Sequence, residues 1–208
     1  RERGWILPSL AELMHVESVP FVSVPSHDTA SAVVSVPAQD EEFIFISSGT
    51  WSLIGTELKA PIINDTVYDM SFANEGGALN TITLLKNSTG MHILQNVKRE
   101  MEKKRGGSYS WEEIVGLSKE AGIEVALYDP NNAKLFNPFK MIDTITELCG
   151  EKDISRILAS SYISLACSYR EAIEDLERLS GSSFNSIHII SGGSKNDYLN
   201  QLTADITN

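Results

Sequence analysis

The stretch EEFIFISSGTWSLIGTEL, residues 41–58, contains two apolar runs separated by a short polar turn. The first run, Glu42 to Ile46, is rich in β-branched and aromatic residues, which predicts a strand. Residues 48–50, Ser-Gly-Thr, suit a turn because glycine adopts turn conformations at little cost. Trp51 to Glu57 predicts a second strand. Two strands joined by so short a turn indicate a β-hairpin.

Upstream of this hairpin, the apolar run from Pro20 to Val24 predicts a buried strand. A helix should follow it, because small and apolar residues cluster at 30–34 and Pro37 then ends the pattern. Asp28 stands where the strand gives way to the helix. Two interpretations stay open for this carboxylate: it caps the helix, or it takes part in chemistry.

Downstream of the hairpin, residues 64–77 read as loop and irregular strand. Apolar residues then recur at helical spacing from Leu79 to Lys104, which predicts one long helix ending at Gly106. Ser110 is placed to cap a further helix that starts at Trp111.

The last part of the chain predicts a helix, a strand and a second helix. A long helix is expected from Asp153 to Leu179, and SIHII, residues 186–190, reads as a buried strand. SGGSKN, residues 191–196, is a glycine turn that leads into a final helix at 197–206. The order of elements predicts an α/β domain in which helices flank a mixed sheet.

Composition excludes several classes of protein. The chain has 208 residues and a formal net charge of −11, and so acidic a surface repels nucleic acid. No apolar run approaches the roughly 20 residues of a membrane span, and the first residues do not resemble a signal peptide. Only two cysteines are present, Cys149 and Cys167, so a reducing cytoplasm is the expected compartment. The histidines show no metal-ligand spacing, and no metal-binding residue is predicted.

Small or polar residues follow three of the expected strands: Asp28, Gly49-Thr50 and Gly192-Gly193. Ligands of α/β proteins collect outside strand ends, so these positions are candidate binding residues. Each also has an ordinary structural explanation, as a helix cap or a turn.

Five motifs together resemble the C-terminal domain of the FGGY carbohydrate kinases, and most closely the rhamnulokinase branch of that family. In chain order they are SHDTASAV, ISSGTWSLIGTE, NEGG, LLKNSTGMHILQ and HIISGGSKNDYLNQL. The resemblance implies an actin-like, ribonuclease-H-like fold. It implies that residues 20–208 are the C-terminal, nucleotide-binding domain and that residues 1–19 are an interdomain segment. The N-terminal kinase domain, and the final strand and helix of the family, would lie outside this sequence.

The resemblance also implies roles for individual residues. Asp28 would be the general base that deprotonates a sugar hydroxyl as it attacks the γ-phosphate. Substrate-binding positions would be His27, Asp28, Thr29 and Asn87, and nucleotide-binding positions would be Thr50, Gln95, Gly192 and Gly193. For Asn87 and Gln95 a solvated helix face is the alternative.

Four further positions also receive assignments. Trp51 is expected in the core, Glu75 of NEGG in a structural or sugar-proximal loop, and Asn196 near the adenine. Ser191 occupies the first place of a turn that often has three glycines in this family. A side chain at Gly192 or Gly193 is expected to fill the space that the nucleotide base needs.

The expected function is phosphorylation of L-rhamnulose to L-rhamnulose 1-phosphate, with ATP and Mg²⁺, by the full-length enzyme. Two alternatives stay open: another FGGY kinase of the xylulose or glycerol type, and a non-catalytic actin-like module that binds nucleotide. The 208-residue chain alone is expected to be inactive, because the expected partners, a sugar and ATP, would lie between two domains.

Overall fold

A five-stranded mixed sheet forms the centre of the described structure, a computed structural model that covers residues 2–25, 27–40 and 42–207. The strands are β3 (Ile44–Ser48), β4 (Trp51–Leu58), β5 (Phe72–Gly76), β6 (Ile82–Thr89) and β7 (Ile187–Ile190). Their order across the sheet is β5-β6-β4-β3-β7; β7 runs parallel to β3 and the other pairs are antiparallel. The predicted α/β class with a mixed sheet is confirmed, and so is the β3–β4 hairpin.

The predicted helix over residues 79–104 is wrong in its first half, where the chain forms β6. In this strand Leu84 packs into the main core, whereas Leu85 lies on the opposite face of the sheet. Both leucines are buried because helices cover both faces, so the strand lacks the alternation of a half-exposed one. Only α4 (His92–Arg105) is helical, and it ends at Gly106 in the left-handed conformation, with φ +72°, as predicted.

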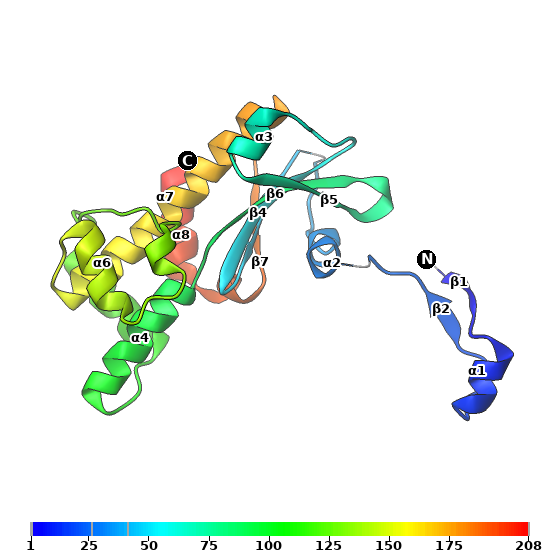
Figure 1. The fold of residues 1–208 in the computed structure, drawn as a ribbon, viewed down its shortest axis with the longest axis horizontal. Helices are drawn as coiled ribbons and strands as arrows, with labels where there is room; N and C mark the ends of the chain where they lie inside the picture. Colours follow the sequence, from blue (N-terminus) through cyan, green and yellow to red (C-terminus); the bar gives the residue numbers. More distant parts are fainter. Residues whose placement is uncertain (1, 26, 41, 208) are drawn as a thin grey trace.

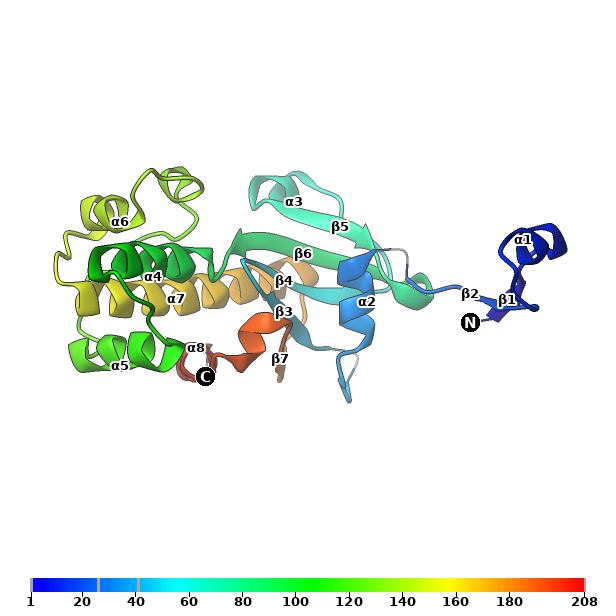
Figure 2. The ribbon, with the colours of Figure 1, turned by 90° about the horizontal axis from the view of Figure 1, so that it is seen from below.

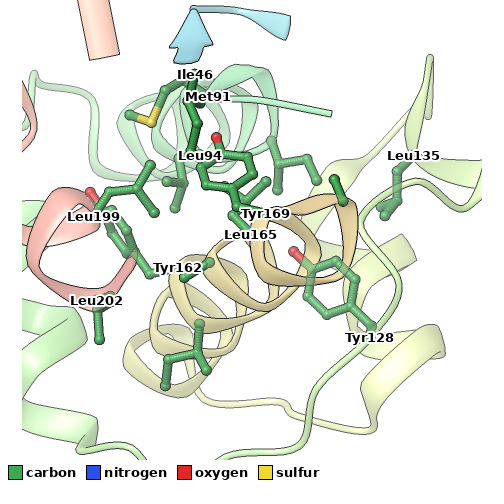
Figure 3. Close-up of a cluster of buried hydrophobic side chains, with 14 of the residues drawn as sticks. Ile46, Met91, Leu94, Tyr128, Leu135, Tyr162, Leu165, Tyr169, Leu199 and Leu202 are labelled. Atoms are coloured by element: carbon green, nitrogen blue, oxygen red, sulfur yellow. The ribbon is translucent and has the colours of Figure 1, made fainter. Parts of the chain in front are cut away.

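One face of the sheet is covered by the long helix α7 (Ile154–Ser180), as Figures 1 and 2 show. Its bounds agree closely with the predicted helix from Asp153 to Leu179, with Asp153 as the N-cap and Gly181 as the C-cap. The helices around it are α4, α5 (Trp111–Ala121), α6 (Met141–Cys149) and α8 (Asp197–Thr207). Their apolar side chains meet those of β3 and α7 in the main core (Figure 3). Helix α6 was not predicted, because a single short amphipathic segment is hard to distinguish from the connector before it.

The other face of the sheet carries the short helix α2 (Asp28–Val34). Val33 packs there against Phe43, Phe45 and Leu85 in a second, smaller apolar cluster. The helix ends before Pro37, as predicted. On this face of the sheet, Asn87 of β6 is exposed.

Residues 2–24 do not join the main sheet. Strand β1 (Glu2–Trp5), helix α1 (Pro8–Leu13) and strand β2 (Pro20–Val22) form a separate two-stranded unit that projects away from the sheet domain (Figures 1 and 2). The predicted strand forms over Pro20–Val22, but the prediction that it is buried is wrong, since Phe21 is 62% exposed. The segment predicted as loop and irregular strand contains α3 (Asp65–Asp69) before β5.

Candidate functional site

A pocket of about 880 Å³ opens where the hairpin tip, α4, α5 and the turn before α8 meet. Its lining includes all four predicted nucleotide-binding residues, Thr50, Gln95, Gly192 and Gly193. These residues come from three segments that lie far apart in the sequence. In Figure 2 the helices concerned, α4, α5 and α8, gather at the end of the domain beyond the hairpin.

The hairpin tip is fixed to the start of α4 by backbone hydrogen bonds. The Gly49 carbonyl accepts from the Met91 N–H at 2.9 Å, and the Thr50 carbonyl accepts from the His92 N–H at 3.2 Å. This close approach requires glycine at position 90, because a Cβ on Gly90 would lie 2.7 Å from the Gly49 oxygen. The contact places Thr50 and Gln95, one turn further along α4, on the same pocket wall.

The two glycines of the turn before α8 differ in what surrounds them. A Cβ on Gly193 would lie 2.0 Å from Ser48 Oγ, so it would collide with strand β3. A Cβ on Gly192 would meet no atom within 4 Å. This corrects the expectation for Gly193: its missing side chain serves packing against the sheet, and Gly192 is the position whose side chain would enter open space.

Ser191 and Asn196 bound this turn, which forms a short 3-10 helix, Gly192–Lys195. Ser191 has φ +69° and ψ −164°, a backbone conformation that glycine adopts most easily, and its Oγ lies 2.9 Å from Ser47 Oγ. Asn196 Oδ1 accepts from the Leu199 N–H at 3.0 Å, and its Nδ2 donates to the Tyr162 hydroxyl at 3.3 Å. The amide of Asn196 is therefore engaged in holding the start of α8.

Helix α5 provides a wall of the pocket that the sequence analysis did not identify. Trp111, Val115, Gly116 and Lys119 line the pocket, at helical spacing that places them on one side of α5. Lys119 Nζ lies 5.2 Å from the centroid of the Tyr198 ring on α8. The helix itself was predicted from its capping residue, and Ser110 does form a capping box with Glu113. The feature of the sequence that could have indicated this wall is Gly116, a glycine in the middle of the helix.

His27, Asp28 and Glu75 form a second polar group, on the α2 face of the sheet. His27 Nδ1 lies 3.5 Å from Glu75 Oε2, and His27 Nε2 lies 3.5 Å from Asp28 Oδ1. The Asp28 side chain is 96% exposed, whereas Thr29 is buried. The N-cap interpretation of Asp28 is wrong, because His27 occupies the cap position and Asp28 is the first residue of α2. Asp28 Oδ1 accepts only the neighbouring Thr29 N–H, at 2.8 Å, among the described hydrogen bonds.

Asn87 lies on strand β6 directly opposite Leu53 of β4, so its alternative assignment to a helix face is wrong. Paired residues of antiparallel strands share a face, which places Asn87 on the α2 side of the sheet. Trp51 was expected in the core but is 42% exposed, with its ring 5.1 Å from that of His92. The strand SIHII is half-buried at the edge of the sheet, and His188 makes an edge-on contact with Phe43 at 5.8 Å.

The structure thus separates the predicted residues into two groups. Thr50, Gln95, Gly192 and Gly193 share one pocket, while His27, Asp28 and Thr29 lie at the start of α2 beside Glu75. Among the residues that the structure describes, no cluster of three or more His, Cys, Asp or Glu side chains is arranged to hold a metal ion. Within the same residues, no helix is long and apolar enough to cross a membrane.

Comparison with known proteins identifies relatives of this chain. The chain is 38% identical over 192 residues to a rhamnulokinase of Bacillus subtilis, covering 89% of the chain and 39% of that protein. It is 36% identical over 208 residues to a rhamnulokinase of Bacteroides thetaiotaomicron, covering 97% of the chain and 42% of that protein. The chain therefore spans about two fifths of the length of these relatives.

Solved structures show the same fold at low sequence identity. A xylulose kinase from Rhodospirillum rubrum matches with a TM-score of 0.74 and 14% identity, over 100% of this chain and 42% of that one. A gluconate kinase from Lactobacillus acidophilus matches with a TM-score of 0.70 and 14% identity, over 98% of this chain and 42% of that one. The actin-like fold of these sugar kinases is therefore the fold of this chain. Residues 44–208 also match the model of the C-terminal domain of the FGGY family of carbohydrate kinases, so the chain belongs to that family.

Proposed function

We propose that this chain is the nucleotide-binding part of a kinase that transfers the γ-phosphate of ATP to L-rhamnulose and forms L-rhamnulose 1-phosphate. The observation that carries the proposal is the pocket, which collects Thr50, Gln95 and the glycine turn from separate segments. The sugar is proposed because two curated relatives at 36% and 38% identity are named rhamnulokinases.

In this proposal the nucleotide occupies the pocket. The 3-10 turn at Gly192–Lys195 precedes α8, and the start of a helix favours anionic groups through its free N–H groups and its dipole. Lys119 and Lys195 line the pocket and provide cationic groups for the phosphates, beside the acidic lining residues Glu112 and Asp197. Mg²⁺ would be held by the phosphates and by water, the ligands it prefers, and would neutralise charge that develops during transfer.

Asp28 acts as the general base in the proposed reaction. Its carboxylate is 96% exposed, so a sugar hydroxyl has access to it. His27 lies beside it and in turn beside Glu75, which restrains the imidazole between two carboxylates. His27, Thr29 and Asn87 are the proposed sugar contacts. The two free cysteines, Cys149 and Cys167, support a reducing compartment, and we propose the cytoplasm.

The experiment uses the proposed full-length kinase, of which this chain would be the nucleotide-binding part, and a panel of L-rhamnulose, D-xylulose and glycerol. We expect ADP release with L-rhamnulose and far less with the other two. Asp28→Asn should keep nucleotide affinity but lower kcat by about 10²- to 10⁴-fold, because the amide cannot accept the proton. Preference for another sugar would replace the substrate assignment. Near-normal turnover by Asp28→Asn would remove Asp28 from the mechanism, and nucleotide binding without any turnover would favour a binding module.

A further inference from the structure

Gly116 lies in the interior of α5, where glycine is an unfavourable residue. Only proline disfavours a helix interior more, because glycine leaves the unfolded chain with the most conformational freedom. A glycine in such a position is usually required by a neighbouring chain that passes close to it. Here a Cβ on Gly116 would meet no atom within 4 Å, and α5 turns right-handedly through this residue without a positive φ. Packing among the described residues therefore does not explain the glycine.

The open space beside Gly116 belongs to the pocket. Trp111, Val115, Gly116 and Lys119 line it from α5, whereas Ile114 and Ser118 on the same helix are buried. Gly116 thus lies on the pocket side of an amphipathic helix. A side chain at this position would project into the space that a ligand would use.

The opposite side of the pocket shows the same feature. Gly192 also lines the pocket, and a Cβ on it would likewise meet nothing within 4 Å. Two elements distant in sequence therefore each present bare backbone to one pocket. The lining from α5 and the start of α8 includes the apolar and aromatic residues Trp111, Val115 and Tyr198 beside the charged residues Glu112, Lys119 and Asp197. Smooth apolar walls suit a flat aromatic group, whereas phosphates gain most from N–H donors and lysines.

We propose that Gly116 is a specificity-determining residue of the nucleotide site, where its missing side chain makes room for the purine base between α5 and the glycine turn. This inference rests on the proposed function, since it assigns one part of the nucleotide to one part of the same pocket. It adds the α5 wall to the residues that contact the nucleotide.

Calorimetric titration of the 208-residue chain with ADP tests the inference through the variant Gly116→Met. We expect an affinity at least about tenfold lower than that of the wild type, because the side chain occupies the place of the base. Glu120→Met is the matched control, since Glu120 is exposed on α5 and does not line the pocket. It should bind as the wild type does. Gly192→Val, on the other wall, should weaken binding as Gly116→Met does.

Gly116→Ala keeps the test decisive if the methionine variant fails to fold. Alanine favours a helix interior, so we expect a higher melting temperature together with weaker ADP binding. Unchanged affinity in a folded Gly116→Met or Gly116→Ala variant would overturn the role of Gly116 while leaving the nucleotide site in place. If the wild-type chain itself gave no heat with ADP, the nucleotide assignment of the pocket would fail, and the role of Gly116 with it.

Discussion

At the scale of single residues, Ser191 has a strained backbone conformation that destabilises the folded state. Its φ of +69° with ψ of −164° falls in a region that is almost exclusive to glycine. A residue with a Cβ in such a region costs about 1–3 kcal/mol. The hydrogen bond between the Ser191 and Ser47 hydroxyls, 2.9 Å long, offsets only part of this, because an exposed neutral bond contributes about 0.5–1.5 kcal/mol.

We therefore expect Ser191→Gly to stabilise the chain by about 1 kcal/mol, measured as a shift in the urea midpoint at constant slope. Ser47→Ala is the control, since it removes the same hydrogen bond and leaves the Ser191 backbone as it is. Ser191→Gly should be more stable than the wild type, and Ser47→Ala slightly less stable. Equal destabilisation by both variants would show that the hydrogen bond outweighs the backbone strain.

The candidate residues were predictable to different degrees, for reasons that are visible in their surroundings. Thr50, Gln95 and the two turn glycines could be located from motifs, and they do share a pocket. The difference between Gly192 and Gly193 could not be predicted, because it depends on the direction of each Cα–Cβ bond relative to strand β3. Trp51 was misassigned for a similar reason, since its exposure depends on how the segments around the hairpin tip, including His92 and Phe136, pack against it.

At the scale of elements, an ion pair between Glu151 and Arg156 links the start of α7 to the connector that follows α5. Glu151 accepts from Arg156 Nε and Nη2 at 2.7 and 2.8 Å and from the Ala126 N–H at 3.0 Å. Arg156 also donates to the Glu124 carbonyl at 2.9 Å. The hydrogen bonds from Arg156, followed by that from Ala126, lower the pKa of Glu151 to about 2.

This pKa predicts how stability depends on pH. A carboxylate whose pKa is lower in the folded state than its ordinary value of 4.5 contributes stability above that value, and loses it as pH falls toward 2. The stability difference between wild type and Glu151→Gln should therefore be full at pH 7 and shrink between pH 4.5 and 2, measured by urea denaturation. Glu147→Gln, beside an exposed lysine at 3.9 Å, should show little difference at any pH. A constant difference for Glu151→Gln down to pH 2 would contradict the assignment.

Elements with strong local signals were predictable, and those defined by tertiary contacts were not. The β3–β4 hairpin, the capping box at Ser110 and the long helix α7 all have their determinants within a few neighbouring residues. Strand β6 was misread because helices cover both of its faces and bury the adjacent leucines 84 and 85. The exposed position of β2 could not be foreseen either, since an apolar run does not specify the sheet it joins.

At the scale of the whole molecule, the proposed catalytic group and the nucleotide pocket are built from different elements of one domain. The pocket is lined by the hairpin tip, α4, α5 and the turn before α8, whereas Asp28 is the first residue of α2, which packs on the face of the sheet opposite α7. Asp28 is 96% exposed and so lies fully in water. Phosphoryl transfer depends on positioning and on excluding water, and an open carboxylate supplies neither.

The 208-residue chain should therefore bind ADP without catalysing sugar phosphorylation. It spans 39–42% of the length of two rhamnulokinase relatives, and closure of domains around the substrates completes many catalytic sites. A coupled assay of ADP release with L-rhamnulose and Mg-ATP should give no rate above background for the chain, while the longer protein turns over under the same conditions. Calorimetry on the same sample should still detect ADP, which distinguishes an incomplete active site from an unfolded one. A turnover rate for the chain close to that of the longer protein would mean that Asp28 acts while open to solvent, and that the base and both substrate sites are contained in this one domain.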